Sequence, residues 1–176
     1  MSRMLNLHIG GKQPHPDWKI LNILPGPEVD FVGDAISLNQ FEDSSVDKIY
    51  ASHILEHLDR QGAQKALREW FRVLRKGGVL MVAVPDLVVL SRLLLRSDLS
   101  VTDMMKITSM IFGGQVDAYD YHKWGYRMET LCYLLRSAGF GTIYRVEQFG
   151  IFNDTSTMMF LEEPISLNVV AHKDLS

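Results

Sequence analysis

The segment "SHILEH" carries the residues best suited to chemistry, because His53, Glu56 and His57 follow the pattern H-x-x-E-H. On a continuous helix this spacing lets two histidines hold zinc while the glutamate activates water. The residues before His53, however, form a β-branched and aromatic run, "VDKIYAS", which is typical of a strand. His53 is therefore expected at a strand-to-helix corner, and no recognisable downstream motif supplies a third ligand. We predict no metal site, and a zinc hydrolase is kept as an alternative.

The elements that must position these residues alternate between strand and helix patterns, which predicts an α/β fold with a mostly parallel sheet. Strands are expected at 4–9, 18–24, 29–34, 46–52, 79–85, 142–149 and 166–173, and helices at 62–76, 87–96, 102–112 and 129–138. The strand at 79–85 has no polar alternation, which indicates burial on both faces beneath helices. In the first helix, Arg68, Arg72 and Arg75 are expected to face solvent.

Composition limits the classes of function. The 176 residues suit a single domain, 1–176, with a hydrophobic core of its own. A net charge of -3 offers no basic field for nucleic acid or an anionic membrane. The single cysteine, Cys132, excludes an internal disulfide, and the longest apolar run is too short to span a bilayer. We expect a soluble cytoplasmic protein. Met104, Met105 and Met110 are expected to pack in the core, and a homodimer surface is the alternative.

Small and polar residues lie at the carboxyl ends of the expected strands, in the order Gly10-Gly11-Lys12, Asn22-Ile23, Asp34-Ala35, Ser52-His53 and Pro85-Asp86. In open α/β sheets, ligands bind beyond the carboxyl ends of the strands. Glycine lets the backbone approach a ligand closely, and Asn22 and Asp34 can hydrogen-bond a ribose or an adenine amine. This edge therefore has the layout of a nucleotide-like pocket. His8, in the middle of the first strand, is expected to be a hydrogen-bonded core residue.

Several segments resemble class I S-adenosylmethionine (SAM)-dependent methyltransferases, in the family's order. They are "LHIGGK", "LNIL", "GDAISL", "FEDSSVDKIYASHILEHL", "ALREWFRVLRKGGVLMVAVPD" and "LLRSAGFGTIYRVEQFG". The combination is most similar to small methyltransferases associated with glycan biosynthesis. The resemblance implies a Rossmann-like, mostly parallel seven-stranded sheet with an antiparallel C-terminal strand. It also implies SAM as cofactor, bound by Gly10, Gly11, Asn22, Ile23, Asp34, Ala35 and Ser52. His53 or His122 would then act as the catalytic base, supported by Glu56 or His57.

The sequence departs from this family at three points. Lys12 replaces the last glycine of G-x-G, and Asn22 replaces the usual acid. The first crossover is also too short for a normal helix, so we expect that helix to be truncated or replaced by a loop. These departures favour the alternative function, a non-catalytic binding module with the same fold and a degenerate cofactor site.

A second polar and aromatic cluster lies at 113–131, and it includes Asp117, Asp120, His122 and Lys123. We expect 87–126 to be an insertion on the acceptor side of the domain. Its groups suit a small polar acceptor such as a sugar or glycan precursor. An ordered surface loop with partly buried aromatic rings is the alternative interpretation.

Overall fold

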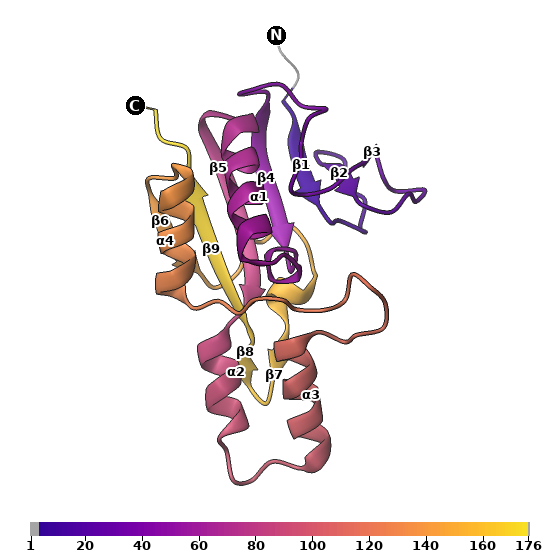
Figure 1. Ribbon diagram of the computed structural model, residues 1–176, viewed down its shortest axis with the longest axis vertical. Helices are drawn as coiled ribbons and strands as arrows, with labels where there is room; N and C mark the ends of the chain where they lie inside the picture. The colour runs from indigo at the N-terminus through magenta and orange to yellow at the C-terminus, as the bar shows by residue number, and fades with distance from the viewer. Residues whose placement is uncertain (1–3, 176) are drawn as a thin grey trace.

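The computed structural model describes residues 4–175, which form an α/β domain built on a seven-stranded sheet (Figure 1). The strand order is β3-β2-β1-β4-β5-β9-β6. The sheet strands are β1 (Asn6–Ile9), β2 (Lys19–Asn22), β3 (Phe31–Val32), β4 (Val46–Ser52), β5 (Leu74–Pro85), β6 (Ile143–Val146) and β9 (Ser166–His172). The helices are α1 (Arg60–Val73), α2 (Leu87–Leu94), α3 (Val101–Phe112) and α4 (Met128–Ala138), with 3₁₀ turns η1 (Leu55–His57) and η2 (Thr155–Thr157). A small hairpin joins β7 (Met159–Phe160) to β8 (Glu163–Pro164).

The predicted topology is confirmed. Strands β1 to β5 pair in parallel, and β9 runs antiparallel between β5 and β6. No helix connects β1 to β2, because residues 10–18 form a loop closed by a bridge between His15 and Trp18. The expected loss of the first crossover helix is therefore confirmed. The sheet has the Rossmann-like arrangement that places a ligand site at the carboxyl ends of its strands.

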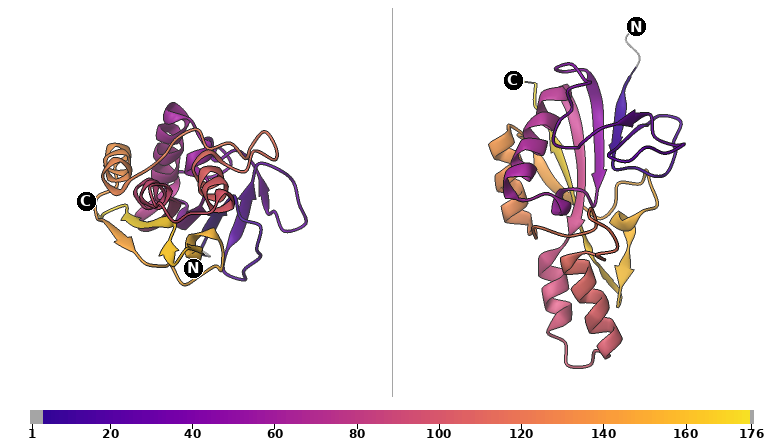
Figure 2. Two further views of the ribbon diagram at one scale, coloured as in Figure 1. Left: turned by 90° about the horizontal axis from the view of Figure 1, so that it is seen from below. Right: turned by 45° about the vertical axis from the view of Figure 1, so that its right-hand side comes forward.

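The two faces of the sheet are covered differently. Helices α1 and α4 pack on one face, where Leu67 and Trp70 join the inward side chains of β4 and β5 in the main core (Figure 2). The opposite face carries a second cluster built on Tyr50 and Phe152, and none of its members lies in a helix. The prediction that β5 is buried on both faces is confirmed. The expectation that helices cover both faces was wrong. Aromatic rings from loops replace one helical layer.

Helix α1 begins at a cap and ends earlier than predicted. The Asp59 carboxylate accepts a hydrogen bond of 2.7 Å from the backbone N–H of Gly62, which satisfies one free donor of the first turn. The helix ends at Val73, three residues before Lys76, because Leu74 already pairs with Val46 as the first residue of β5. Gly77 does adopt the expected positive φ, of 74°, but inside this strand.

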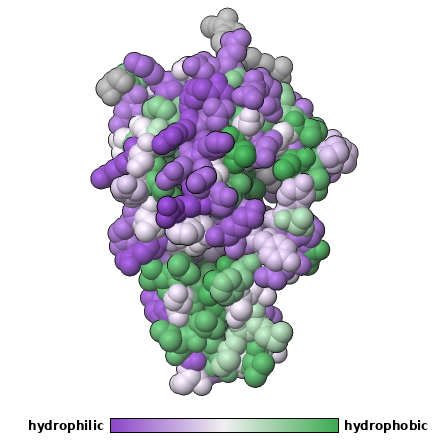
Figure 3. Space-filling view, in the orientation of Figure 1, coloured by the Kyte–Doolittle hydropathy of each residue, from purple (hydrophilic) through white to green (hydrophobic). Residues whose placement is uncertain are grey.

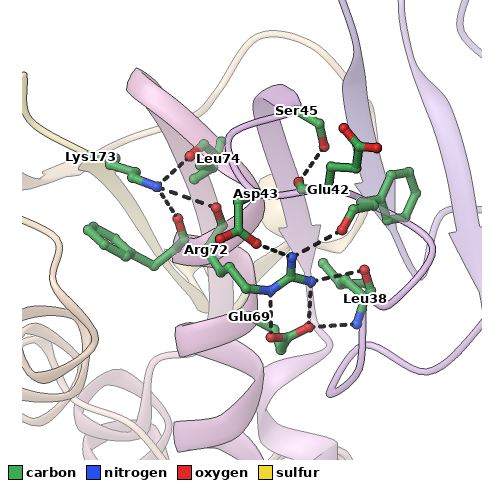
Figure 4. Close-up of polar contacts among 10 residues, drawn as sticks. Leu38, Glu42, Asp43, Ser45, Glu69, Arg72, Leu74 and Lys173 are labelled. Atoms are coloured by element: carbon green, nitrogen blue, oxygen red, sulfur yellow. Dashed lines mark hydrogen bonds and ion pairs between the residues drawn. The ribbon is translucent and has the colours of Figure 1, made fainter.

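The prediction that Arg72 faces solvent was wrong. Its side chain binds the 38–43 loop to α1 (Figure 4). Its guanidinium donates to both carboxylate oxygens of Glu69, to Asp43, and to the carbonyls of Leu38 and Phe41. The planar group satisfies several acceptors at once, which a lysine cannot do in this geometry. Arg68 is exposed as expected.

The ammonium group of Lys173 lies beside this network and donates to the carbonyls of Phe71 and Leu74 at the end of α1. A cation there complements the negative end of the helix dipole. Lys173 thereby ties the C-terminal end of β9 to the helix that covers the main core.

Helices α2 and α3 form a hairpin that extends beyond the carboxyl ends of the strands (Figures 1 and 2). Asp86 caps α2 by accepting from the N–H groups of Val88 and Val89, so this strand-end carboxylate is used structurally. The apolar surface gathers over the hairpin (Figure 3). The expected burial of the methionines was wrong for Met104 and Met105, which are 37% and 67% exposed, whereas Met110 packs against the cluster around Leu90. Within residues 4–175, every helix is too short or too polar to cross a bilayer.

The Arg72 network yields a stability prediction. Arg72→Ala should lower the free energy of unfolding by about 1–3 kcal/mol, because it leaves loop carbonyls and Glu69 without their shared donor. Arg68→Ala, on the exposed face of the same helix, is the matched control and should change it by less than about 0.5 kcal/mol. Urea unfolding followed by circular dichroism measures both. Equal effects of the two substitutions would show that the network does not hold the loop.

Candidate functional site

A cavity of about 1470 Å³ lies at the carboxyl ends of the strands, and it holds nearly all the residues singled out from the sequence. Nine predicted site residues line it, namely Gly10, Gly11, Asn22, Ile23, Asp34, Ala35, Ser52, His53 and His122. Helix α3, the 113–123 loop and the 152–158 segment complete the wall. The volume exceeds the range of about 300–1,000 Å³ usual for one small ligand, so the cavity has room for two molecules side by side.

The glycine turn after β1 forms one end of the cavity. Gly10 has a φ of 74° and donates its N–H to the carbonyl of Leu21 at 2.7 Å, which links the ends of β1 and β2. A side chain at Gly10 would clash with Ile54, and one at Gly11 would clash with the His8 ring. Both positions therefore require glycine, and the backbone here is open to a ligand.

The side chains of Asn22 and Asp34 differ in how many of their polar atoms already have hydrogen-bond partners. The amide of Asn22 donates to the Gly11 carbonyl at 3.2 Å and accepts from the Leu24 N–H at 3.1 Å, so it braces the glycine turn. One oxygen of Asp34 accepts from the Ile36 N–H at 3.0 Å, while the other makes no hydrogen bond within residues 4–175. Asp34 therefore keeps a free acceptor on the cavity wall. The buried hydroxyl of Ser52, also on this wall, lacks a partner in the same part of the chain.

These features fit an adenosyl group. Ile23, Ile36 and Leu58 supply apolar wall beside the free oxygen of Asp34, which suits a flat ring bearing an amine. The unpaired Ser52 hydroxyl offers a further polar contact on the same side.

His53 turns the chain from β4 into η1. Its φ is 53°, in the left-handed region that is uncommon for residues other than glycine. Its backbone N–H donates to the carbonyl of Ala83, so the corner is anchored to β5. The predicted strand-to-helix corner is confirmed, and η1 is only three residues long. The continuous helix required by the zinc-hydrolase alternative is therefore absent from this segment of the described chain.

Both ring nitrogens of His53 are engaged. Nε2 lies 2.8 Å from the hydroxyl oxygen of Ser166, which itself donates to the Thr155 carbonyl, so Nε2 must be the donor. Nδ1 lies 3.0 Å from Oε1 of Glu56, at an angle too poor for a hydrogen bond. The Ser166–His53–Glu56 row looks like a nucleophile relay, but Ser166 is 4% exposed and its proton is committed to Thr155. It cannot attack a substrate in the cavity.

Glu56, His57 and His122 meet behind the cavity wall. The backbone carbonyl of Glu56 accepts from the N–H groups of Lys123 and Trp124, at 2.7 and 3.3 Å, and this brings His122 beside η1. The rings of His57 and His122 lie edge to face, with centroids 4.8 Å apart. Burial lowers the pKa of His122 from its ordinary value. Glu56 and His122 are 66 positions apart in the chain and no sequence motif relates them, so sequence analysis missed this cluster.

The 113–127 loop is ordered by its own polar groups. Asp117 accepts from the Tyr119 N–H at 2.7 Å, and Asp120 accepts from the Val116 N–H at 3.3 Å. Gly113, with a φ of 87°, leaves no room for a side chain against the Asp120 carbonyl. In the 113–127 loop, the rings of Tyr119, Tyr121 and Trp124 are exposed, whereas that of Tyr126 is buried. The loop thus presents aromatic rings and carboxylates around the mouth of the cavity.

Sequence reasoning also missed the 152–158 segment, because its polar residues match no motif. Phe152, Asn153, Asp154 and Thr155 line the cavity. Asp154 accepts a hydrogen bond of 2.9 Å from the Tyr50 hydroxyl, which places the segment against the sheet. The only signal was a run of residues that favour turns between two strands.

His8 lies beneath this segment and is not hydrogen-bonded as expected. It is 5% exposed, its Nδ1 has no partner within residues 4–175, and its ring packs against Phe152 at 4.2 Å. Burial lowers the pKa of His8 from 6.5 to about 4. The fold therefore holds this histidine neutral.

The pKa of His8 predicts how stability changes with pH. Between pH 6.5 and about 4, the unfolded chain binds a proton at His8 that the folded chain excludes. The free energy of unfolding should therefore fall as the pH falls through this range, by up to about 3 kcal/mol. His8→Asn should reduce that slope, as measured by urea unfolding at a series of pH values. A slope unchanged in the variant would contradict the assignment.

Comparison with known proteins agrees with this site. A family profile described as "Methyltransferase domain" matches residues 18–82, and no curated protein matches the chain. Among solved structures, a SAM-dependent methyltransferase from Archaeoglobus fulgidus is 17% identical with a TM-score of 0.62, over 97% of this chain and 86% of that chain. A SAM-dependent methyltransferase from Thermotoga maritima is 21% identical with a TM-score of 0.52, over 84% and 65% of the two chains.

Human N-acetylserotonin methyltransferase, in complex with SAM, is 15% identical with a TM-score of 0.57, over 97% of this chain and 47% of that chain. Similarity at these identities establishes the fold, and the family profile covers β2 to β4 with Asn22, Asp34 and Ser52, but not β1 with Gly10 and Gly11. The chain therefore has the fold of S-adenosylmethionine-dependent methyltransferases, and its residues 18–82 match the methyltransferase domain profile.

Proposed function

We propose that this domain transfers a methyl group to a small polar acceptor, with a sugar or glycan precursor as the acceptor class. The observation that carries the proposal is the shared cavity, in which the cofactor residues at the strand ends face the 113–123 loop. When bound, the cofactor supplies an electrophilic methyl group on a sulfonium sulfur, and this group passes to an acceptor atom held in line. The protein contributes chiefly by positioning the two molecules.

The cofactor side of the proposal rests on the residues after β1, β2, β3 and β4. Gly10 and Gly11 give backbone access, Asp34 offers its free carboxylate oxygen to the adenine amine, and Ser52 offers its unpaired hydroxyl. Asn22 is assigned a supporting role, since its amide already braces the glycine turn. Ile23 and Ala35 complete the contact surface.

The acceptor side of the proposal consists of the segment 87–126, which we treat as an insertion in the domain. Asp117, Asp120 and Lys123 line the cavity there together with the ring of Tyr119. Carboxylates and an amine beside an aromatic ring suit the hydroxyl groups and apolar faces of a sugar. The exposure of Tyr119 favours this use over a purely structural loop.

His122 is the proposed catalytic residue, acting on the acceptor. Its ring lines the cavity on the acceptor side, and an imidazole there can contact the acceptor oxygen directly. His53, the other candidate, is assigned a positioning role, because one nitrogen is bonded to Ser166 and the other faces Glu56.

Binding of S-adenosylhomocysteine, the product form of the cofactor, tests the cofactor site. At a concentration one hundred times its dissociation constant, it should stabilise the fold by about 2.7 kcal/mol. Asp34→Asn keeps the turn to Ile36 but places an NH₂ group opposite the adenine amine, so affinity should fall by roughly tenfold or more. Isothermal titration calorimetry and thermal melting measure the two effects.

Asp98→Asn is the matched control, because Asp98 is exposed at the tip of the α2–α3 hairpin and should leave affinity unchanged. If the parent chain does not bind the nucleoside at millimolar concentration, the enzyme proposal fails and the non-catalytic binding module takes its place. Equal affinities of the parent and Asp34→Asn would instead remove Asp34 from the cofactor site.

A further inference from the structure

The buried carboxylate of Glu56 lacks the partners that such a group needs. Glu56 is 1% exposed, and neither of its oxygens makes a hydrogen bond within residues 4–175. Nδ1 of His53 lies 3.0 Å from its Oε1, within ion-pair distance but outside hydrogen-bond geometry. Burying a carboxylate without compensation costs several kcal/mol or more. The site therefore has the electrostatic character of one that accepts a cation.

Two imidazoles face the same point as this carboxylate. Ligand atoms of Glu56, His57 and His122, one from each, all lie within 4.8 Å of one another. Nδ1 of His57 and Nδ1 of His122 are both buried, and each lacks a partner in the described part of the chain. Ligands of one tetrahedral cation are separated by about 3.4 Å when each bond is about 2.1 Å, so modest side-chain rotations close the set.

We propose that Glu56, His57 and His122 bind a divalent transition-metal cation, with Zn²⁺ as the ion that fits best. A set of two imidazole nitrogens and one carboxylate binds such ions in preference to Mg²⁺ or Ca²⁺. His53, held by Ser166, positions the Glu56 carboxylate. The site differs from that of an H-x-x-E-H peptidase, because the second nitrogen comes from a distant loop.

The geometry also gives this cation a role. His57 and His122 line the cavity while Glu56 lies behind them, so a cation held by these three ligands would lie at the cavity wall with a coordination position left for an acceptor. A hydroxyl oxygen bound there loses its proton to water more easily, and the oxygen then takes the methyl group as the methyl–sulfur bond breaks. This role rests on the proposed methyl transfer to an oxygen acceptor, and in the metal-bound protein His122 would act on that oxygen through the cation instead of contacting it directly.

Metal binding by the full-length chain tests the site without any acceptor. After chelator treatment and dialysis, the parent should take up one Zn²⁺ per chain, measured by elemental analysis, and Co²⁺ should give a visible absorption band. Glu56→Gln keeps the shape of the side chain but removes its charge, and it should weaken Zn²⁺ binding by roughly tenfold or more. His122→Gln should do the same.

His172→Gln is the matched control, because His172 is on β9 and outside the cavity, and it should bind Zn²⁺ like the parent. Circular dichroism establishes that each variant is folded. No stoichiometric uptake by the parent, or equal affinity in folded Glu56→Gln and His122→Gln, would overturn the site. If both variants unfold, the parent chain alone decides the question. A parent chain that gives no Co²⁺ absorption band also overturns the proposed metal site.

The open position has a separate test. Acetohydroxamate, a small ligand that binds metals through two oxygens, should shift the Co²⁺ band of the parent. An unshifted band would contradict the role in acceptor binding. Metal uptake is measured without nucleoside, and binding of S-adenosylhomocysteine is measured without metal. A chain that binds Zn²⁺ but not the nucleoside therefore refutes the methyltransferase proposal alone, and the reverse result refutes the metal site alone.

Discussion

The candidate site depends on the backbone carbonyl of Glu56, which accepts hydrogen bonds from Lys123 and Trp124. This contact joins the corner after β4 to the end of the segment that follows α3. Tyr126 adds two further links to the same edge, because its hydroxyl donates to the Leu55 carbonyl and its carbonyl accepts from the Leu87 N–H. These contacts together hold the 113–127 loop beside the strand ends, where both line one cavity.

The carbonyl of Glu56 can serve in this way because the chain turns sharply at His53. A left-handed residue after a buried strand ends β4 and starts a single 3₁₀ turn rather than a long helix. Such a turn leaves its carbonyls free for partners outside the segment, whereas an α-helix would use them internally. The strain at His53 is offset by its bonds to Ala83 and Ser166. The corner is therefore rigid, which a site for positioned chemistry needs.

The sequence predicted the sheet well because its signals are local. Apolar runs such as "VDKIYAS" and "VLMVAVP" define strands, and polar residues at their ends define one edge of a parallel sheet. The predicted role of Asn22 is less secure, since its amide is occupied by Gly11 and Leu24. No pattern distinguishes an amide that braces a turn from one that binds a ligand. That distinction depends on the closure of the loop at 10–18.

The proximity of Glu56 and His122 could not be predicted, because it depends on how residues 87–126 fold back onto the strand ends. The sequence alone left "SHILEH" without a third ligand, and that absence argued against metal. In the proposed metal site, the third ligand comes from a loop whose conformation is set by Gly113, Asp117 and Asp120. A buried carboxylate beside two unpartnered imidazole nitrogens is costly for a folded chain to keep without a use. In the proposed metal site, a bound cation would offset that cost.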